Sequence, residues 1–196
     1  MALAAPGSAD PLPASREGAI VAEINRARAD PAGYAETLKA YRRLYRGRLV
    51  RQPGEPEPLL TKEGPRAVDE AIAYVRRARP LPPLGWDAAL ALAADDHVRA
   101  QGARGLTGHA GPDGSTPGRR ITRRGVGYVL AGETIAYGPR DAVAVVRELI
   151  VDDGVADRNH RTVIFTAALD RAGAACGPHR DYGTMCVIDF AGGRVR

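Results

Sequence analysis

Two short apolar runs near the end of the chain limit the fold more than any other feature of the sequence. The runs are "RAGAACG" and "TMCVIDFAG", and the polar, glycine-containing stretch "PHRDYG" separates them. Short apolar runs that flank turn residues predict the two strands of a β-hairpin. Because the apolar face of a sheet must be buried against another layer, helices from the rest of the chain are expected to cover this hairpin.

The two cysteines of the sequence fall one in each run, at Cys176 and Cys186. Cysteines on neighbouring strands are close enough to form a disulfide, and a disulfide across a hairpin suits an oxidising compartment. Two buried free thiols are the alternative. A zinc site on this pair is not expected, because the spacing differs from that of the usual close Cys motifs.

Apolar residues at helical spacing precede the hairpin in several segments. These segments are 15–31, 31–45, 65–80, 81–105 and 140–154, with a shorter helix expected at 116–125 that begins with Thr116 as its N-cap. Residues 47–64 are rich in Gly and Pro and predict a loop. Residues 128–138 and 160–165 are short and apolar, and we interpret both as strand or extended chain. The pattern predicts an α+β fold, in which helices sandwich a mostly antiparallel sheet.

The length of 196 residues suits one domain, which we place at 17–196, after a flexible Pro/Ala-rich tail at 1–16. The tail "MALAAPGSADPLPAS" has the small-residue character of the end of a secretory cleavage site, so we expect an exported precursor whose signal has been removed. A cytosolic protein with a Pro/Ala-rich tail is the alternative. No stretch approaches the roughly 20 apolar residues that a membrane span needs.

The formal net charge is +5 and the sequence pI about 9.5. The densest basic run, "YRRLYRGRLVR", covers residues 41–51, and a second basic set lies at 119–124. Either these arginines form a solvated face, or they contact phosphate headgroups of an anionic membrane surface or an acidic glycan. Aromatic residues make up only 5% of the chain, so no base-stacking platform is visible and nucleic acid is not expected as a partner.

Three polar residues stand in surroundings that demand an explanation: His109 in a Gly-rich loop, Glu133 in "GETIAYG", and His160 in "DRNHR". A carboxylate among apolar residues needs a partner, and a histidine can provide one. Two imidazoles with one or two carboxylates suit a divalent ion such as Zn²⁺ that keeps water in its remaining positions. Alternatively, these groups hydrogen-bond one another and tie the loop to the sheet. Two other histidines are expected to be structural, with His97 packed on a helix face and His179 in the hairpin loop, remote from the cleft.

The order of these motifs resembles the CAP superfamily, named for cysteine-rich secretory proteins, antigen 5 and pathogenesis-related proteins, in a bacterial form with an SCP domain. The resemblance rests on "GH" at 108–109, "GETI" at 132–135, the helix at 140–154, "HR" at 160–161 and the ending "CGPHRDYGTMCVIDF". It covers roughly residues 17–192. It implies an αβα sandwich, usually exported, with a cleft lined by two histidines and two acidic residues.

The matching cleft positions are His109, Glu133 and His160, and the sequence departs from the family pattern near two of them. Thr134 stands where the family usually has Asn, and the second acid falls at Asp152 or Asp153 instead of Glu; we favour Asp152. Residues 41–80 resemble a helical insertion relative to compact family members.

The expected function is that of a secreted, monomeric binding module. Its His- and Glu-lined cleft is expected to hold a divalent metal, with zinc bound by His109 and His160. The ligand of the cleft is expected to be an apolar or lipid-like molecule, a glycan or a protein. One alternative is a metal-dependent, peptidase-like hydrolase that uses His109, His160 and Glu133, with Asp152 as a further catalytic candidate. A structural extracellular domain with a vestigial cleft is another. Ser115 and Thr116 are expected to serve in a turn and a cap, because no nucleophile motif surrounds them.

Overall fold

A central four-stranded sheet organises the protein, as seen in a computed structural model that describes residues 12–53, 57–139 and 141–193. Its strands, in the spatial order β4-β6-β7-β5, are β4 (Gly85–Trp86), β6 (Arg171–His179), β7 (Gly183–Gly192) and β5 (Leu130–Tyr137). β7 pairs antiparallel with both β6 and β5, whereas the short β4 runs parallel to β6. The predicted hairpin is thus β6–β7, and β5 confirms the strand expected at 128–138.

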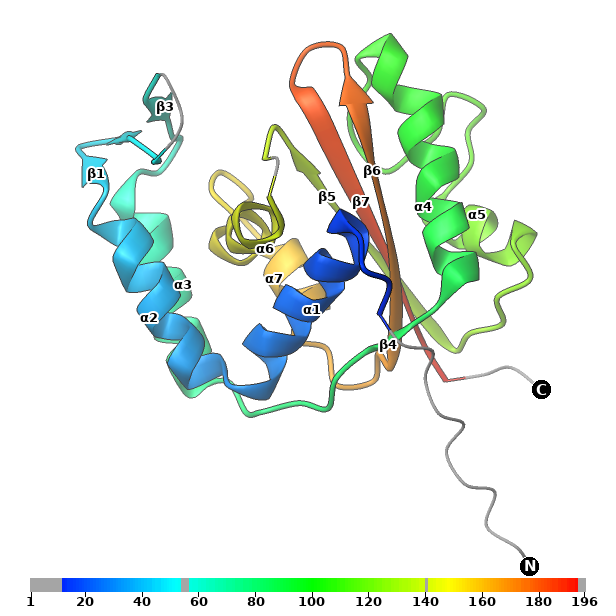
Figure 1. Cartoon of the computed structure of the whole chain (residues 1–196), viewed down its shortest axis with the longest axis horizontal. Helices are drawn as coiled ribbons and strands as arrows, with labels where there is room; N and C mark the ends of the chain where they lie inside the picture. Colours follow the sequence, from blue (N-terminus) through cyan, green and yellow to red (C-terminus); the bar gives the residue numbers. More distant parts are fainter. Residues whose placement is uncertain (1–11, 54–56, 140, 194–196) are drawn as a thin grey trace, which may run out of the picture.

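Helices cover both faces of this sheet (Figure 1). One face carries α4 (Ala88–Gln101) and α5 (Pro117–Arg123), and the other carries α1 (Arg16–Ala29), α6 (Ala142–Val151) and α7 (Asn159–Ile164). A 3₁₀ turn, η1 (Gly102–Arg104), follows α4. Beyond α1 and α6, α2 (Pro31–Arg42) and α3 (Pro65–Arg77) pack against each other. The predicted α+β class, an αβα sandwich with a mostly antiparallel sheet, is confirmed.

Successive side chains of each strand point to opposite faces of the sheet, and both faces are buried under helices. On β7, Ile188 and Phe190 belong to the larger core under α1 and α6, whereas Met185 and Val187 pack with α4. Gly173 on β6 permits the close approach of α4, because a Cβ there would lie 2.1 Å from the backbone nitrogen of Ala91. The sheet therefore holds α4 close on one side, which matters for the position of the loop that follows it.

Cys176 and Cys186 are directly opposed in the β6–β7 register and form a disulfide. The disulfide expectation is confirmed, and the alternative of two free thiols is not what the structure contains.

Several of the predicted elements differ from the structure. Residues 160–165, interpreted as a strand, lie mostly in α7, because Asp152 accepts hydrogen bonds from the backbone N–H groups of His160 and Arg161 and so stabilises the start of this helix. Within the predicted helix at 81–105, the observed helix α4 begins only at Ala88, and the side chain of Asp87 caps it. Residues 85–86, at the start of the predicted helix, form the strand β4 instead. The predicted helix at 31–45 ends at Arg42.

The segment 47–64, predicted as a loop, takes part in a second, small sheet. Its strands, β1 (Tyr45–Arg46), β2 (Leu49–Val50) and β3 (Leu59–Leu60), pair antiparallel in that order. Strands of two residues are too short to show an alternating pattern in the sequence, which is why the Gly and Pro signal dominated.

The predicted tail lies largely outside the described residues, in 1–11. Within the described part, Ser15 caps α1 by accepting a hydrogen bond from the backbone N–H of Gly18 at 3.2 Å. None of the helices in the described ranges has the length and apolar character needed to cross a membrane.

Candidate functional site

Two histidine–carboxylate pairs face each other across one pocket. His109 Nδ1 lies 2.7 Å from Glu133 Oε1, and His160 Nδ1 lies 2.6 Å from Asp152 Oδ1. The centroids of the two imidazole rings are 6.2 Å apart. The structure therefore brings together all four residues that the sequence singled out, from a loop, a strand, a helix end and a helix start.

Several hydrogen bonds hold the loop that carries His109. His97 Nε2 lies 2.9 Å from the carbonyl of Gly108, and the Gln101 side chain donates to the same carbonyl. The backbone N–H of Gly108 donates to the Tyr137 hydroxyl at 2.9 Å. His97 is fully buried, so its expected structural role has a specific form: it fixes the residue next to His109.

Glu133 lies on β5 with its side chain buried, and Arg120 holds its other oxygen. Arg120 Nη2 donates to Oε2 at 2.6 Å, and the same guanidinium donates to the carbonyl of His109. Burial acts to raise the pKa of Glu133, but the hydrogen bond from His109 and the charge of Arg120 outweigh it, so the pKa is lowered. Glu133 is thus an ionised carboxylate at neutral pH.

Gly132, the residue before Glu133, explains how α7 reaches this part of the sheet. A Cβ at Gly132 would lie 3.0 Å from a methyl group of Val163, so the glycine makes room for α7 against β5. Because α7 begins at Asn159, this contact also places His160 beside the strand that carries Glu133.

Asp152 ends α6 in the left-handed conformation, with φ of +60°, which Asp tolerates better than most residues. Its carboxylate accepts from the backbone N–H of His160 at 3.0 Å as well as from the His160 ring. Asp153 lines the same pocket, but its carboxylate accepts from the backbone N–H groups of Lys62 and Glu63. Of the two candidates for the second acid, Asp152 is the one bonded to a histidine.

The pocket has a volume of about 280 Å³, and its walls combine His109, His160, Asp152 and Asp153 with Gly108, Ile135, Tyr137, Glu148, Leu149 and Val155. Two larger hollows, of about 410 and 530 Å³, lie along α4, and neither is lined by a histidine. The pocket between the histidine pairs is therefore the one of the three in which histidines and carboxylates converge.

Glu148 is a pocket acid that the sequence reasoning missed. Glu148 lies in the concave wall of the pocket, with protein close around it, and its side chain is still accessible to solvent. The surrounding protein raises its pKa to about 7; Arg147 opposes this rise, and the charges of Asp153 and Asp152 add to it. A signal was present in its position, four residues before Asp152 and so on the same side of α6.

Arg120 and Asp189 form a buried layer behind Glu133 that the sequence did not reveal. Arg120 belongs to the basic set at 119–124, for which a solvated face or a phosphate contact was expected, yet its side chain is buried. Asp189 on β7 is directly opposite Glu133 and fully buried, and neither of its oxygens has a hydrogen-bond partner among the described residues. Burial and the neighbouring charge of Glu133 raise the pKa of Asp189 well above its usual range, which favours the protonated form of this acid.

The other polar candidates have structural positions. Thr116 caps α5 by accepting from the backbone N–H of Arg119, as expected, and Ser115 is buried beside Arg120. His179, expected in the hairpin loop, is instead the last residue of β6 and is buried. Its ring does not line the pocket but contacts Tyr137, which does, with ring centroids 5.3 Å apart.

A family model described as "CAP: Cysteine-rich secretory protein family" matches residues 70–190, which is more than half of the chain and includes all four members of the histidine pairs. The chain belongs to the CAP family. The match begins within α3, so it leaves out α2 and the small β1–β3 sheet.

Solved structures agree with this assignment. An extracellular protein from Bacillus anthracis that contains an SCP domain is 26% identical, with a TM-score of 0.50, over 81% of this chain and 50% of that one. An outer surface protein from Borrelia burgdorferi is 23% identical, also with a TM-score of 0.50, over 59% of this chain and 80% of that one, and this likeness concerns the fold alone. This CAP protein thus spans about half the length of its Bacillus relative. No curated protein matches the sequence significantly.

Proposed function

We propose that this CAP protein is an extracellular binding module whose ligand lies in the pocket between His109 and His160. The observation that carries this proposal is the pairing of each Nδ1 atom with a carboxylate, while neither Nε2 has a hydrogen-bond partner among the described residues. The two rings line one pocket with their centroids 6.2 Å apart, so one ligand can contact both. The disulfide and the description of the Bacillus relative as extracellular support an exported location.

A divalent ion such as zinc fits these two histidines as a partner. Ligating histidines usually donate their other ring N–H to a carboxylate, which fixes the tautomer and the ring orientation. His109 and His160 would supply two ligands, and the carboxylates of Glu133 and Asp152 would orient them without touching the metal. When bound, zinc would polarise a ligand oxygen in the pocket.

Two protein ligands favour a weakly held ion. Within the described ranges, no group of three or more His, Cys, Asp and Glu side chains is arranged to hold a metal. Structural zinc sites use four protein ligands and catalytic ones usually three. The remaining positions would therefore go to water or to a group of the bound ligand.

The geometry favours binding over hydrolysis. Glu133, the general base of the hydrolase alternative, does not line the pocket, and both of its oxygens are engaged by His109 and Arg120. It is therefore poorly placed to take a proton from water.

The size and lining of the pocket favour one polar group as the part of the ligand that enters. Its volume of about 280 Å³ is at the lower end of small-molecule sites, and Glu148, Asp152 and Asp153 line it beside Leu149. A single sugar ring or one side chain of a protein partner suits this space better than a whole lipid chain does.

The experiment is a calorimetric zinc titration at neutral pH on metal-stripped protein, the His109→Ala, His160→Ala double variant and, as a control, His179→Gln. We expect binding of one zinc ion per chain in the native protein and in the control, and none in the double variant. Zinc at about 100 times its Kd should also stabilise the native fold by about 2.7 kcal/mol. No heat and no thermal stabilisation would contradict the metal proposal.

A further inference from the structure

The small β1–β2–β3 sheet, which we call the outer sheet, is a separate feature of the molecule. It lies at the far end of the α2–α3 pair, away from the central sheet (Figure 1). It also lies outside residues 70–190, the part that the family model matches. A role for the outer sheet would therefore belong to this chain and not to the CAP family in general.

Leucines are unusually exposed on the outer sheet. The exposed fractions are 44% for Leu49, 54% for Leu59 and 61% for Leu60. Leu49 is directly opposite both Arg46 and Leu60 in the strand register, so the three form one row across the sheet. The second row of the sheet consists of Tyr45, Val50 and Leu59, of which Tyr45 and Val50 are buried in the main core.

The segment that forms the outer sheet is rich in cations. Residues 42–62 contain six basic residues and two acidic ones. Arg43, Arg46, Arg48 and Lys62 are exposed, and none of them has a carboxylate partner among the described residues. The side chains of Arg46 and Arg48 instead donate to backbone carbonyl groups of neighbouring residues, which leaves their charge uncompensated.

The outer sheet is firmly attached to the pocket wall. The Asp153 carboxylate accepts from the backbone N–H groups of Lys62 and Glu63 at 2.6 and 2.8 Å. Glu63 in turn accepts from Arg158 at 2.6 and 2.8 Å and from the backbone N–H of Gly154. These hydrogen bonds lower the pKa of Glu63 to about 2, so the attachment stays ionised across the physiological pH range.

We infer that the outer sheet is a docking surface for a lipid bilayer that contains anionic headgroups. Leu49 and Leu60 enter the boundary between headgroups and acyl chains, while Arg46 and Arg48 contact lipid phosphates. Apolar insertion combined with electrostatic attraction is the usual basis of reversible membrane-surface binding. A charged protein partner would also meet the arginines, but unpaired arginines beside exposed leucines suit the layered chemistry of a bilayer surface better.

The test is co-sedimentation with vesicles of phosphatidylcholine containing about one-third phosphatidylserine, compared with vesicles of phosphatidylcholine alone. We expect binding only to the anionic vesicles and a steep loss in high salt. Each basic residue near an anionic surface contributes about a fivefold change in affinity, so Arg46→Gln with Arg48→Gln should weaken binding about 30-fold. Leu49→Ser with Leu60→Ser should weaken it as well, without changing its salt dependence.

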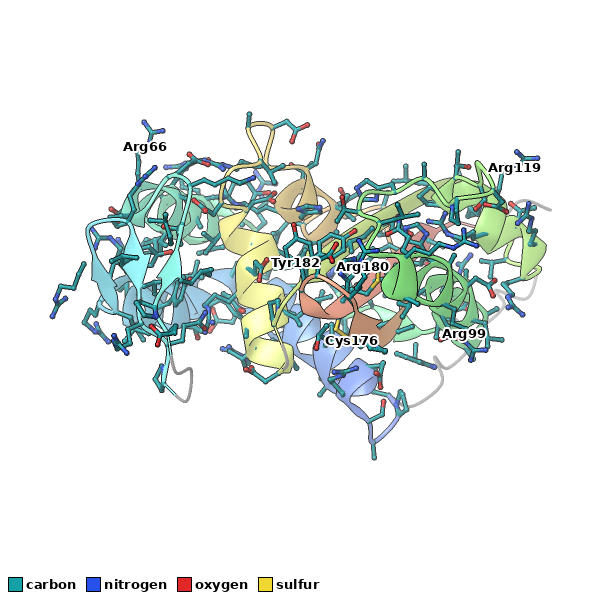
Figure 2. All side chains as sticks on the ribbon, turned by 90° about the horizontal axis from the view of Figure 1, so that it is seen from above. Arg66, Arg99, Arg119, Cys176, Arg180 and Tyr182 are labelled. Atoms are coloured by element: carbon teal, nitrogen blue, oxygen red, sulfur yellow. A yellow bond between two sulfur atoms is a disulfide. The ribbon has the colours of Figure 1, made fainter. Side chains whose placement is uncertain are left out.

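Matched controls use the other end of the molecule. Figure 2 shows Arg99 and Arg119 at the end opposite the outer sheet, so Arg99→Gln with Arg119→Gln removes the same charge elsewhere. Leu92, 49% exposed on α4, and Leu106, 41% exposed, are the matched leucines for substitution by Ser. Both control variants should bind like the native protein.

Absence of binding to anionic vesicles at low salt would overturn the proposal, and so would an equal loss in the control variants. Because every substituted residue is exposed, circular dichroism should show unchanged folding. The proposal is independent of the pocket, and the His109→Ala, His160→Ala variant should still bind vesicles.

Discussion

The two histidine–carboxylate pairs have the same inner bond and different supports. In both, a carboxylate oxygen lies 2.6 to 2.7 Å from Nδ1 of the histidine. Glu133 also accepts a hydrogen bond from a buried side-chain cation, Arg120, whereas Asp152 also accepts hydrogen bonds from backbone N–H groups of α7. One pair depends on a charge brought from another element, and the other depends on the local geometry of the chain.

This difference also sets how far apart the partners lie in the sequence. Asp152 and His160 are 8 residues apart, while His109 and Glu133 are 24 residues apart and Arg120 lies between them. The first pair requires only that α7 follows α6 in this arrangement, because Asp152 ends α6 and His160 lies in the first turn of α7. The second exists only after β5, α5 and the loop at His109 have packed together.

Of the changes to the two pairs, replacement of Arg120 should lower the free energy of unfolding most. Arg120→Leu leaves the buried Glu133 without its cation and next to Asp189, and loss of one partner of a buried ion pair costs about 3–5 kcal/mol. We expect that loss in the free energy of unfolding, measured by urea denaturation at neutral pH. Arg119→Leu, the exposed neighbour, is the control and should change it by less than about 0.5 kcal/mol. A loss below about 1 kcal/mol for Arg120→Leu would show that Glu133 does not depend on this cation.

Replacement of Asp152 should have a smaller effect, because its support is backbone. Asp152→Ala removes the acceptor for His160 and places Ala at a φ of +60°, for a loss of about 2 kcal/mol in the free energy of unfolding. Asp152→Asn keeps one acceptor oxygen and tolerates that backbone conformation, so it should lose less than half as much. Urea denaturation of both variants measures this, and equal losses would indicate that the charge, not the hydrogen-bond geometry, stabilises the pair.

A pH series should distinguish the two pairs, since among the described residues only Glu133 has a second fully buried acid, Asp189, beside it. The pKa of Asp189 is raised well above its usual range in the folded protein, whereas its unfolded-state pKa is about 3.9. Folding therefore takes up a proton, and stability is lost as pH rises from about 4 towards the raised folded-state pKa.

Asp189→Asn imitates the protonated acid and removes this pH dependence. It should match the native protein near pH 4 and exceed it by about 1 kcal/mol or more at pH 7. Urea denaturation across that range measures the difference. Parallel pH profiles for the two proteins would contradict a protonated Asp189.

Predictions from sequence succeeded where the signal was local or resembled a family. Thr116 was identified as a cap because a cap is set by neighbouring residues, and Cys176 and Cys186 were identified as a cross-strand pair from the hairpin that encloses them. Residues 160–165 were misassigned because three apolar residues in a row are typical of a strand. The acceptor that favours α7 is the Asp152 carboxylate, which lies at the end of the preceding helix and accepts hydrogen bonds from the first backbone N–H groups of α7.

The partners of the buried charged groups could not be predicted from the local sequence. Nothing near Arg120 distinguishes it from Arg119, yet one is buried against Glu133 and the other is exposed. Asp189 likewise resembles an ordinary polar residue in an apolar strand until the β5–β7 register places it opposite Glu133.

The sequence by itself therefore determined the helices and strands that follow local rules, the hairpin with a cysteine on each strand, and, through the resemblance to the CAP family, His109, Glu133 and His160 as a set with Asp152 or Asp153 as the second acid. Only the tertiary structure decided that each carboxylate bonds to Nδ1, that Arg120 and Asp189 lie behind Glu133, and that the leucines of the outer sheet are exposed. The physical reason is that backbone conformation depends on residues a few positions apart, whereas desolvation and charge pairing depend on which elements are packed against each other.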